Sequence, residues 1–281
     1  MALSPAPQKD HIEWHPASLL NEDRATQRFA LLILNQPLRD VETLKRLWAN
    51  ASLRVAADGG ANRLYSLRGR DQNKDDEDAF PFVTLDVIIG DLDSLTDTTR
   101  EYYEAVHPSM KVIHDSDQYS TDFTKAGRYV QAARGGAMDI VAMGGLGGRV
   151  DQGLSQIHHL YMFQTSPTYE EGKMYLVSGE SLTFVLKAGS HKIHVREQRP
   201  GAEAGQPAEE VFDKYAGIVP VKEPSLITLK GFEWDVEDWP TEFGGQISTS
   251  NHVLPESQFV EVITSKDVIF TIALKGRGDK G

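Results

Sequence analysis

Short apolar runs alternate with longer amphipathic stretches between residues 29 and 170 of the chain. Five apolar runs follow this pattern, at residues 29–35, 54–60, 86–91, 111–117 and 139–145. Runs that are apolar throughout, rather than at every second position, suit strands that are buried on both faces. Each run is followed by a stretch of helical length. This alternation predicts right-handed βαβ units in a mostly parallel sheet flanked by helices.

The pattern changes after about residue 173. Short β-rich runs such as SLTFVLKA and DVIFTIAL are divided by Gly, Pro, Asn and Ser, which is typical of an antiparallel sandwich or barrel. The turn-forming sequence SPTYEEG precedes this change. We therefore predict an α/β fold in three parts: an N-terminal extension at 1–28, an α/β domain at 29–170 and an antiparallel β-sandwich domain at 171–281.

Two segments have the composition of surface insertions. Residues 70–79 are strongly acidic, and residues 197–210 consist largely of Pro, Gly, Ala and Glu. The second segment buries too little apolar area to order itself. We expect neither segment to take part in chemistry.

Composition and charge narrow the functional classes. The chain has 281 residues, 40% of them apolar, and a net charge of −12. Nucleic acids and anionic membranes are bound through clustered Lys and Arg, so the acidic balance argues against both as partners. The absence of cysteine excludes disulfides and thiolate metal sites. A small ligand or a protein partner is the remaining expectation.

The first 28 residues lack the features of a targeting segment. They contain charged residues and proline but no apolar run of signal-peptide length. They also lack the Arg-rich, acid-poor composition of a transit peptide. No segment approaches the roughly 20 apolar residues that span a bilayer. We expect a soluble cytoplasmic protein with a loosely held N-terminus.

Candidate chemistry begins at VIIGDLDS, where a buried-type strand ends in Asp91 and Asp93. Ligand sites of open parallel sheets lie at the carboxyl ends of the strands. If the strand continues through residue 91, both side chains share one face, and a divalent cation such as Mg²⁺ would compensate their repulsion. The structural alternative is that Asp91 caps a turn and that Asp93 or Ser94 caps the next helix.

The segment DSDQYSTDFTKA adds a third acid. Ser120 or Thr121 is a natural N-cap, and Asp122 then lies in the first turn, where the helix dipole favours a carboxylate. The functional alternative makes Asp122 a further oxygen ligand beside the two aspartates of GDLDS. Lys125, one turn later, either holds a phosphate oxygen or is solvated.

A strand-to-helix loop, MGGLGGRVDQ at 143–152, contains four glycines. It matches neither the dinucleotide nor the Walker fingerprint. Glycines still let backbone N–H groups approach an oxyanion at a helix N-terminus, and Arg149 would add a fork-shaped donor. The alternative is a flexible tight turn. AADGGANRLY at 56–65 repeats this arrangement more weakly.

The β-rich half offers an aromatic site. Trp234 and Trp239 lie close to a polar strand end with Ser248, Ser250 and Asn251. Such a group would suit a flat, heteroaromatic, cationic acceptor. The alternative is a core Trp beside a Gly-rich hairpin.

We do not expect the two histidine pairs of the sequence to be catalytic residues or metal ligands. His158 and His159 are adjacent on a predicted helix, so they face different directions and suit surface and core edge rather than ligation. His191 and His194 are three apart on a predicted strand, hence on opposite faces. No Ser-His-Asp arrangement or nucleophile elbow is visible.

Together, acidic metal ligands and glycine-rich anion cradles describe a site for a polyphosphate chelated by Mg²⁺. Six motifs between residues 54 and 251 sharpen this interpretation: DGGANRLY, GDLDS, DQYSTDFTKA, GGLGGRVDQ, GFEW and GGQISTSN. With these motifs in this order, the sequence resembles the eukaryotic thiamine pyrophosphokinases. The resemblance implies an α/β domain followed by a β-sandwich, and homodimers with composite sites at the subunit interface. It implies transfer of diphosphate from ATP to the hydroxyl of thiamine, giving thiamine diphosphate and AMP with Mg²⁺.

The resemblance also implies residue roles. The catalytic and metal-binding residues would be Asp91, Asp93 and Asp122. The nucleotide would be bound by Asp58, Gln118, Thr121, Gly147, Gly148, Arg149 and Asp151, to which we add Lys125. Thiamine would be bound by Trp234, Ser250 and Asn251 of the second subunit. The chain departs from the family pattern at Tyr119, where many relatives have a third acid, at Leu92, where an aromatic is common, and in the length of segment 197–210.

Two rival functions use the same residues. A metal-dependent phosphohydrolase would activate water with these acids and consume ATP without thiamine. A nucleotide or thiamine sensor would bind without turnover. Release of AMP from ATP, measured with and without thiamine, separates the three possibilities.

Overall fold

The computed structural model describes residues 11–21, 28–68, 80–133, 137–197 and 210–276. Most of both expected insertions, 70–79 and 197–210, lies outside the described residues. The chain divides into two compact units, Leu19–Thr183 and Met1–Ser18 with Phe184–Gly281. We call these the α/β unit and the β-rich unit.

The α/β unit is built on a parallel sheet, as the sequence predicts. Its strands lie in the order β7 (Met174–Val177), β6 (Asp139–Met143), β2 (Phe29–Ile33), β3 (Leu53–Ala57), β4 (Val87–Gly90) and β5 (Lys111–His114). All neighbours in this series pair in parallel. Every residue of β2 and β6 is buried, which explains why both strands are apolar apart from Asp139 at the start of β6. The edge strand β5 is partly exposed.

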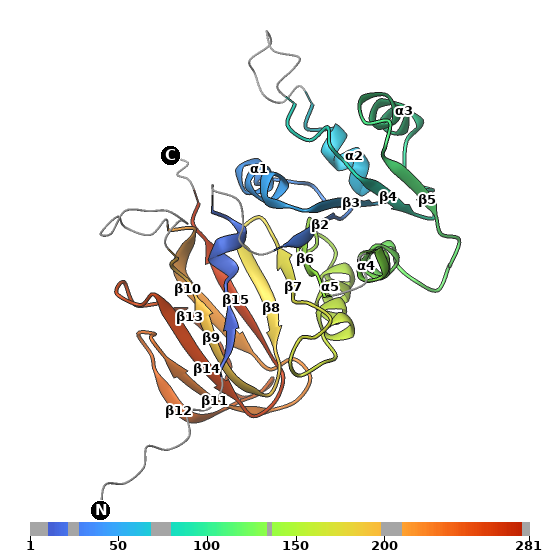
Figure 1. Cartoon of the computed structure of the whole chain (residues 1–281). Coiled ribbons are helices and arrows are strands. Elements are labelled where there is room, and N and C mark those ends of the chain that lie inside the picture. The colour runs from blue at the N-terminus through green and yellow to red at the C-terminus, as the bar shows by residue number, and fades with distance from the viewer. Residues whose placement is uncertain (1–10, 22–27, 69–79, 134–136, 198–209, 277–281) are drawn as a thin grey trace, which may run out of the picture. The chain divides into compact units, whose positions relative to one another are not determined.

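In the described ranges of this unit, helices cover the sheet on its two faces (Figure 1). They are α1 (Val41–Asn50), α2 (Gly60–Tyr65), α3 (Asp97–Val106), α4 (Asp122–Ala133) and α5 (Val150–Phe163). Helices α1, α2 and α3 lie on one face, and α4 and α5 lie on the other. The strand order reverses beside β2, since β3 follows on one side and β6 on the other. In sheets of this kind the ligand crevice lies at such a reversal, beyond the carboxyl ends of the strands.

The β-rich unit contains strands of two sheets. One sheet has the order β1 (Ile12–Trp14), β9 (Gly189–His194), β14 (Phe259–Thr264), β11 (Ser225–Lys230) and β12 (Val236–Thr241). Next to one another in the other sheet are β13 (Ser248–His252), β10 (Phe212–Val219) and β15 (Val268–Leu274). Strands β1 and β9 pair in parallel, and the pairs β9–β14, β14–β11, β11–β12, β13–β10 and β10–β15 are antiparallel. The buried ring of Trp14 stacks on Phe184 with centroids 4.3 Å apart, and Phe184 in turn contacts buried Phe270, with centroids 5.1 Å apart.

The expectation of a loosely held N-terminus is wrong for residues 12–19. Strand β1 pairs in register with β9, and the following 3-10 helix η1 (Pro16–Leu19) is largely buried. Trp14 is fully buried and donates its indole N–H to His191 at 3.1 Å. A buried tryptophan of this size anchors the segment to the core.

The division between the units also differs from the expected boundary at 170/171. Strand β7 pairs in parallel with β6, so the parallel sheet takes in one strand more than the change of sequence texture suggests. The chain passes from one unit to the other within β8 (Ser181–Leu186), whose first half pairs antiparallel with β7. In the described part of the chain, no helix is long and apolar enough to cross a membrane.

Candidate active site

Three carboxylates meet where β3 and β4 end. Asp58 follows β3, and Asp91 and Asp93 follow β4, which pairs with β3 in parallel. One oxygen from each of the three side chains lies within 4.8 Å of the others. Carboxylate oxygens at this spacing form the kind of ligand set that hard divalent cations take.

Asp58 is the buried member of this group, being 2% exposed. Its backbone is left-handed, with φ 43°, a conformation that Asp tolerates better than most residues. Its Oδ2 accepts a hydrogen bond from the Ser94 backbone at 3.1 Å, whereas its buried Oδ1 has no hydrogen-bond partner among the described residues. Burial raises the pKa of Asp58, and the charges of Asp122 and Asp91 add to this rise. A buried acid with an unpaired oxygen fits a ligand that carries positive charge.

Asp91 and Asp93 come together through a turn and not through strand alternation. Strand β4 ends at Gly90, and Leu92 between the two acids has φ 62°. The Asp93 backbone N–H donates to Asp91 Oδ1 at 3.4 Å. The alternative that Asp93 or Ser94 caps the next helix is wrong, because Thr96 caps α3.

Gly90 makes room for two of the acids. A Cβ at this position would lie 2.7 Å from Asp58 Cβ and 2.9 Å from Asp122 Oδ1. Only a residue without a side chain allows both aspartates to approach the end of β4 so closely.

Asp122 and Lys125 complete the charged site from the first turn of α4. Lys125 is 2% exposed, and its Nζ lies 3.4 Å from Asp122 Oδ1 and 3.8 Å from Asp91 Oδ2. Burial raises the pKa of Asp122, the charge of Asp91 adds to the rise, and Lys125 opposes it. The alternative of a solvated Lys125 is therefore wrong. The structure groups Asp58, which the resemblance assigns to the nucleotide, with Asp91 and Asp93, while Asp122 lies beside Asp91.

The predicted N-cap at Thr121 is confirmed. Its hydroxyl accepts from the Thr124 backbone at 3.2 Å and lies 2.9 Å from His159 Nε2. Burial lowers the pKa of His159, whose ring also stacks on Phe123 with centroids 4.3 Å apart. His159 is thus a core residue that fastens α4 to α5, and His158 is exposed, as the sequence indicated. Gln118 is exposed at the start of this loop.

The glycine loop after β6 is exposed to solvent from Gly147 onward, whereas Gly145 is buried. Gly144, Gly147 and Gly148 all have positive φ, at 84°, 130° and 72°. Arg149 donates from Nε and Nη2 to the two carboxylate oxygens of Asp151, at 3.1 and 2.5 Å, and both side chains are exposed. The predicted fork-shaped donor therefore pairs with Asp151 in this structure, and the exposed backbone of the loop remains to receive an anion.

A cavity of about 580 Å³ lies at the reversal of strand order. It is lined by the loops after β2, β6 and β7, with these residues: Gln36, Pro37, Leu38, Arg39, Asp40, Met143, Gly144, Leu146, Gly147, Gly148, Val177, Ser178, Gly179, Glu180 and Ser181. The loop after β2 continues toward the acids, since Asn35 Oδ1 accepts from Arg63 of α2 at 2.9 Å. This edge of the sheet thus carries both a cavity bounded by glycines and a cluster of acids.

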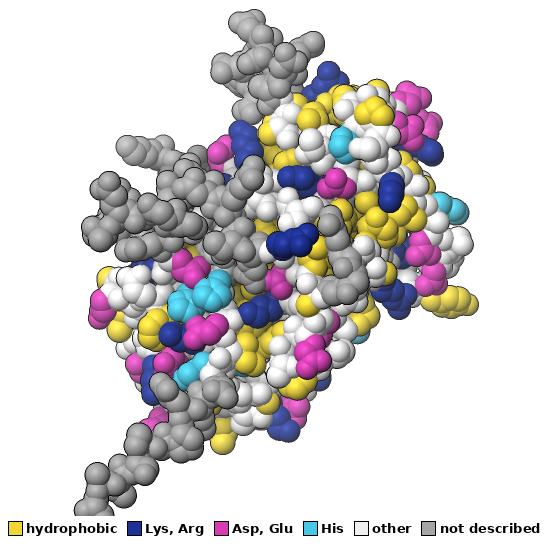
Figure 2. Space-filling model, in the orientation of Figure 1, with side chains coloured by type: hydrophobic (Ala, Val, Ile, Leu, Met, Phe, Trp, Pro, Cys, Tyr) yellow, Lys and Arg dark blue, Asp and Glu magenta, His cyan; other side chains and the backbone are white. Residues whose placement is uncertain are grey.

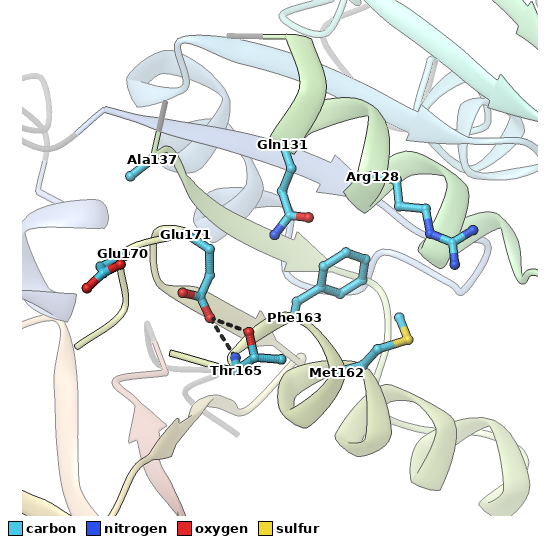
Figure 3. A pocket seen from close by; sticks show the side chains of 8 residues that line it. All are labelled: Arg128, Gln131, Ala137, Met162, Phe163, Thr165, Glu170 and Glu171. Carbon is cyan, nitrogen blue, oxygen red and sulfur yellow. Dashed lines mark hydrogen bonds between the residues drawn. The ribbon is translucent and has the colours of Figure 1, made fainter. Parts of the chain in front are cut away.

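A second cavity, of about 560 Å³, lies on α4 and the end of α5 and contains none of the predicted site residues (Figure 3). One of its two carboxylates, that of Glu171, already accepts hydrogen bonds from the backbone N–H groups of Thr165 and Ser166, at 2.6 and 2.9 Å. These bonds hold the loop that follows α5.

In the β-rich unit, the predicted substrate residues gather around an exposed indole. Trp234 is 53% exposed, so the alternative of a core tryptophan is wrong for this residue. Asn251 is buried, and its side-chain amide bonds to the backbone N–H and C=O of Trp234. Ser250 is exposed, with φ 56°.

Sequence reasoning missed the other members of this aromatic group. The centroid of the His252 ring lies 4.9 Å from that of Trp234 and 5.1 Å from that of Tyr215. The Nδ1 atom of His252 lies 2.5 Å from Glu233 Oε2. Tyr215 belongs to β10 and is brought to His252 by strand pairing. The position of Tyr215 beside His252 depends on how β10 pairs with β13, which the sequence around either residue does not reveal.

Comparison with known proteins identifies the family of this chain. A family model described as "Thiamin pyrophosphokinase, catalytic domain" matches residues 44–170, and one described as "Thiamin pyrophosphokinase, vitamin B1 binding domain" matches residues 190–269. Thiamine pyrophosphokinase 1 of Arabidopsis thaliana is 33% identical over 275 residues, which cover 94% of each chain. The chain belongs to the thiamine pyrophosphokinase family. Thiamine pyrophosphokinase 3 of Oryza sativa subsp. japonica is 32% identical over 88% of this chain and 87% of its own.

Two solved structures share the fold of this chain. A thiamin pyrophosphokinase from Candida albicans aligns with a TM-score of 0.74 at 24% identity, over 98% of this chain and 96% of its own. The yeast thiamin pyrophosphokinase gives the same TM-score and identity, over 98% and 94%. Thiamine pyrophosphokinases are diphosphotransferases that use ATP. The predicted fold class, a helix-flanked parallel sheet followed by a strand-rich domain, is thereby confirmed.

Proposed function

We propose that this protein transfers the diphosphate group of ATP to the hydroxyl of thiamine, producing thiamine diphosphate and AMP. The observation that carries the proposal is the convergence of Asp58, Asp91 and Asp93, with Asp122 and buried Lys125 beside Asp91, on the sheet edge that also bears the glycine-bounded cavity. A triphosphate needs both positive charge and backbone donors, and this edge offers a place for each.

The acids fit a hard divalent cation such as Mg²⁺. Asp58, Asp91 and Asp93 supply oxygens within 4.8 Å of one another, and Asp58 Oδ1 is buried without a partner in the described part of the chain. In the proposed site these three residues hold the ion, with Asp122 next to Asp91. The bound ion would neutralise charge on the polyphosphate and orient it. Lys125, held between Asp91 and Asp122, balances part of the acidic charge when the ion is absent.

The chain's other residues position the nucleotide. The open backbone of Gly147 and Gly148, at the N-terminus of α5, binds phosphate oxygens, and the neighbouring cavity receives the nucleoside. Arg149 exchanges Asp151 for a phosphate, since its fork matches either anion. Thr121 acts through its cap on α4, which carries Asp122 and Lys125, and Gln118 contacts the nucleotide from the loop before this helix.

The transfer itself is a displacement at the β-phosphorus. The thiamine hydroxyl oxygen forms a bond to this atom, and the bond to the oxygen of the α-phosphate breaks. AMP leaves with that electron pair, and the hydroxyl proton is released. Precise placement of the two substrates supplies most of the acceleration in such a reaction.

Thiamine is proposed to bind in the β-rich unit of a second subunit. The exposed Trp234 offers a flat face to the cationic ring, and Ser250 and Asn251 form the polar end of the pocket. The proposal therefore includes a homodimer whose sites combine residues of both chains. We further propose a cytoplasmic location, which imaging of a fluorescent fusion would test.

Release of AMP from ATP and Mg²⁺, measured with and without thiamine, tests this function. We expect AMP and thiamine diphosphate to appear in equal amounts and only when thiamine is present. AMP or phosphate formed without thiamine would favour a phosphohydrolase. Binding of both substrates without turnover would favour a sensor. Single-turnover assays of Asp91→Asn should show a large loss of rate with a modest change in thiamine affinity, and the exposed Asp97→Asn serves as the matched control.

A further inference from the structure

A second group of potential metal ligands lies on the β-rich unit, on strands that the acidic site does not use. Glu13, His15 and His194 each offer one ligand atom, and these atoms lie within 4.8 Å of one another. Figure 2 shows histidine side chains beside acidic and basic ones on the face where Figure 1 places β1.

Strand pairing places these side chains on one face. In the parallel pair β1–β9, Glu13 lies opposite Lys192 and Trp14 lies opposite Ile193. Trp14 and Ile193 are fully buried, so the alternation of side chains turns their neighbours outward. Glu13 and His15 on one segment therefore stand beside Lys192 and His194 on the other.

The side chains of Glu13, His15 and His194 contact one another directly. His194 Nε2 lies 2.5 Å from Glu13 Oε2, and the rings of His15 and His194 stack with centroids 4.5 Å apart and an angle of 10°. Glu13 is exposed and both histidines are partly exposed, so a metal ion can reach them from solvent.

A second carboxylate lies on the other side of His15. Glu197 Oε1 is 2.5 Å from His15 Nδ1, and the Glu197 side chain is 19% exposed. Its other oxygen, Oε2, is buried and has no hydrogen-bond partner within the described ranges. Two imidazoles thus stand between two carboxylates, one of which retains an unused oxygen.

The mixture of ligands favours a different ion from that of the acidic site. Two histidines with carboxylates form a ligand set typical of Zn²⁺, whereas the all-oxygen set at Asp58 suits Mg²⁺. The positive charge of Lys192 disfavours binding of a metal ion at this group, since its Nζ lies 3.7 Å from Glu13 Oε1. The same Nζ lies 4.2 Å from the ring centre of Phe259, which receives it when the carboxylate turns to a metal ion.

We propose that Glu13, His15 and His194, with Glu197 as a further ligand, form a Zn²⁺ site that ties β1 to β9. The ion joins residues 13–15 to residues 194–197 and fastens the N-terminal strand to the β-rich unit. Because only the folded chain brings these residues together, zinc stabilises the native state. This site is separate from the proposed diphosphate transfer and does not depend on it.

Titration of the metal-free, full-length protein with Zn²⁺ tests the site. Excess Mg²⁺ is kept present so that the acidic site is occupied by its own ion. We expect one equivalent of Zn²⁺ to bind and to raise the melting temperature. His15→Gln and His194→Asn should each weaken this binding by at least about tenfold, in the range seen for losses at metal sites. His158→Gln removes an exposed histidine of α5 and should bind zinc like the unaltered protein.

Substitution of Co²⁺ for Zn²⁺ reports on the ligands directly. The visible absorption of a four-coordinate Co²⁺ site should appear in the unaltered protein and disappear in His194→Asn. Circular dichroism and thiamine-dependent AMP release check that the variants fold. If a histidine variant does not fold, Glu13→Gln replaces it, since this side chain is exposed. The proposal is overturned if the unaltered protein binds no Zn²⁺ in excess Mg²⁺, or if the site variants bind it as tightly as His158→Gln.

Discussion

Asn251 holds the backbone of Trp234 with both atoms of its side-chain amide. Its Oδ1 accepts from the Trp234 N–H at 3.3 Å, and its Nδ2 donates to the Trp234 carbonyl at 3.0 Å. Asn251 is 4% exposed, whereas Trp234 is 53% exposed. The buried amide therefore determines where the exposed indole stands, and Asn251 acts on the proposed thiamine pocket as a positioning residue.

Asn251→Ala, which removes two hydrogen bonds to Trp234, should raise the KM for thiamine about thirtyfold while kcat changes by less than about twofold. Each lost hydrogen bond is worth about 1 kcal/mol, and about 1.4 kcal/mol corresponds to a factor of ten. The acids that act on ATP lie in the other unit and keep their geometry. Steady-state AMP release at saturating ATP measures both constants.

Thr249→Ala is the matched control, because Thr249 is an exposed polar residue of the same strand. It should leave both constants unchanged. A fall in kcat with an unchanged KM for Asn251→Ala would mean that Asn251 does not act by positioning Trp234.

Much of this architecture follows from local sequence pattern. The apolar runs FALLI and IVAM predict buried parallel strands, and both strands form where expected. The carboxyl ends of parallel strands share one edge, and on that ground the sequence predicts Asp122 as the third acid beside Asp91 and Asp93. The group within 4.8 Å contains Asp58 instead, whose position after β3 the sequence pattern did not mark as part of the acidic group.

Other features depend on contacts that no local pattern contains. The three-residue sequence IEW is too short for its pattern to predict a strand. It forms one because Trp14 stacks on Phe184 and donates a hydrogen bond to His191. The burial of Lys125 likewise results from α4 packing on the sheet, which pattern alone leaves open. The Glu13 and His194 contact joins segments 181 positions apart, and only the register of β1 on β9 creates it.

Gly90→Ala should lower the rate of thiamine-dependent AMP release about a hundredfold while leaving the protein folded. The new Cβ would lie 2.7 Å from Asp58 Cβ and 2.9 Å from Asp122 Oδ1, so at least one aspartate must move. Displacement of about 1 Å in such a site costs about a hundredfold in rate. Initial rates, together with the melting temperature, measure the effect.

Gly153→Ala provides the contrast, because a Cβ there has no described atom within 4 Å. This glycine lies within α5, where alanine is favoured by about 0.5–1 kcal/mol. The control should be fully active and slightly more stable. Equal activity of Gly90→Ala and Gly153→Ala would contradict the proposed packing of the acids.

Stabilisation by Mg²⁺ should increase with pH. Burial raises the pKa values of Asp58 and Asp122 above 3.8, so the folded chain keeps protons that the unfolded chain has released. Without a divalent ion, the free energy of unfolding therefore falls as pH rises from about 3.8 through the raised pKa values. Mg²⁺ competes with these protons, and it should raise the melting temperature more at about pH 7.5 than at about pH 4.5.

Asp58→Asn separates this effect from general charge repulsion. The variant should be more stable than the unaltered protein without Mg²⁺ at about pH 7.5, because an unpaired buried charge is removed, and Mg²⁺ should stabilise it less. Glu256→Gln removes an exposed carboxylate of the β-rich unit and should change neither quantity. An Mg²⁺ effect that is equal at both pH values would contradict binding at these acids.

Mixing two inactive variants tests whether each site combines residues of two chains. Asp91→Asn disables the acidic site, and Trp234→Ala disables the proposed thiamine pocket. If the two lie in one site across a dimer interface, a mixed dimer has one doubly damaged site and one intact site. Random exchange of subunits gives half mixed dimers, so activity should recover to about a quarter of the unaltered value. Sites contained within single chains would give no recovery, and light scattering of the mixture verifies that dimers are present.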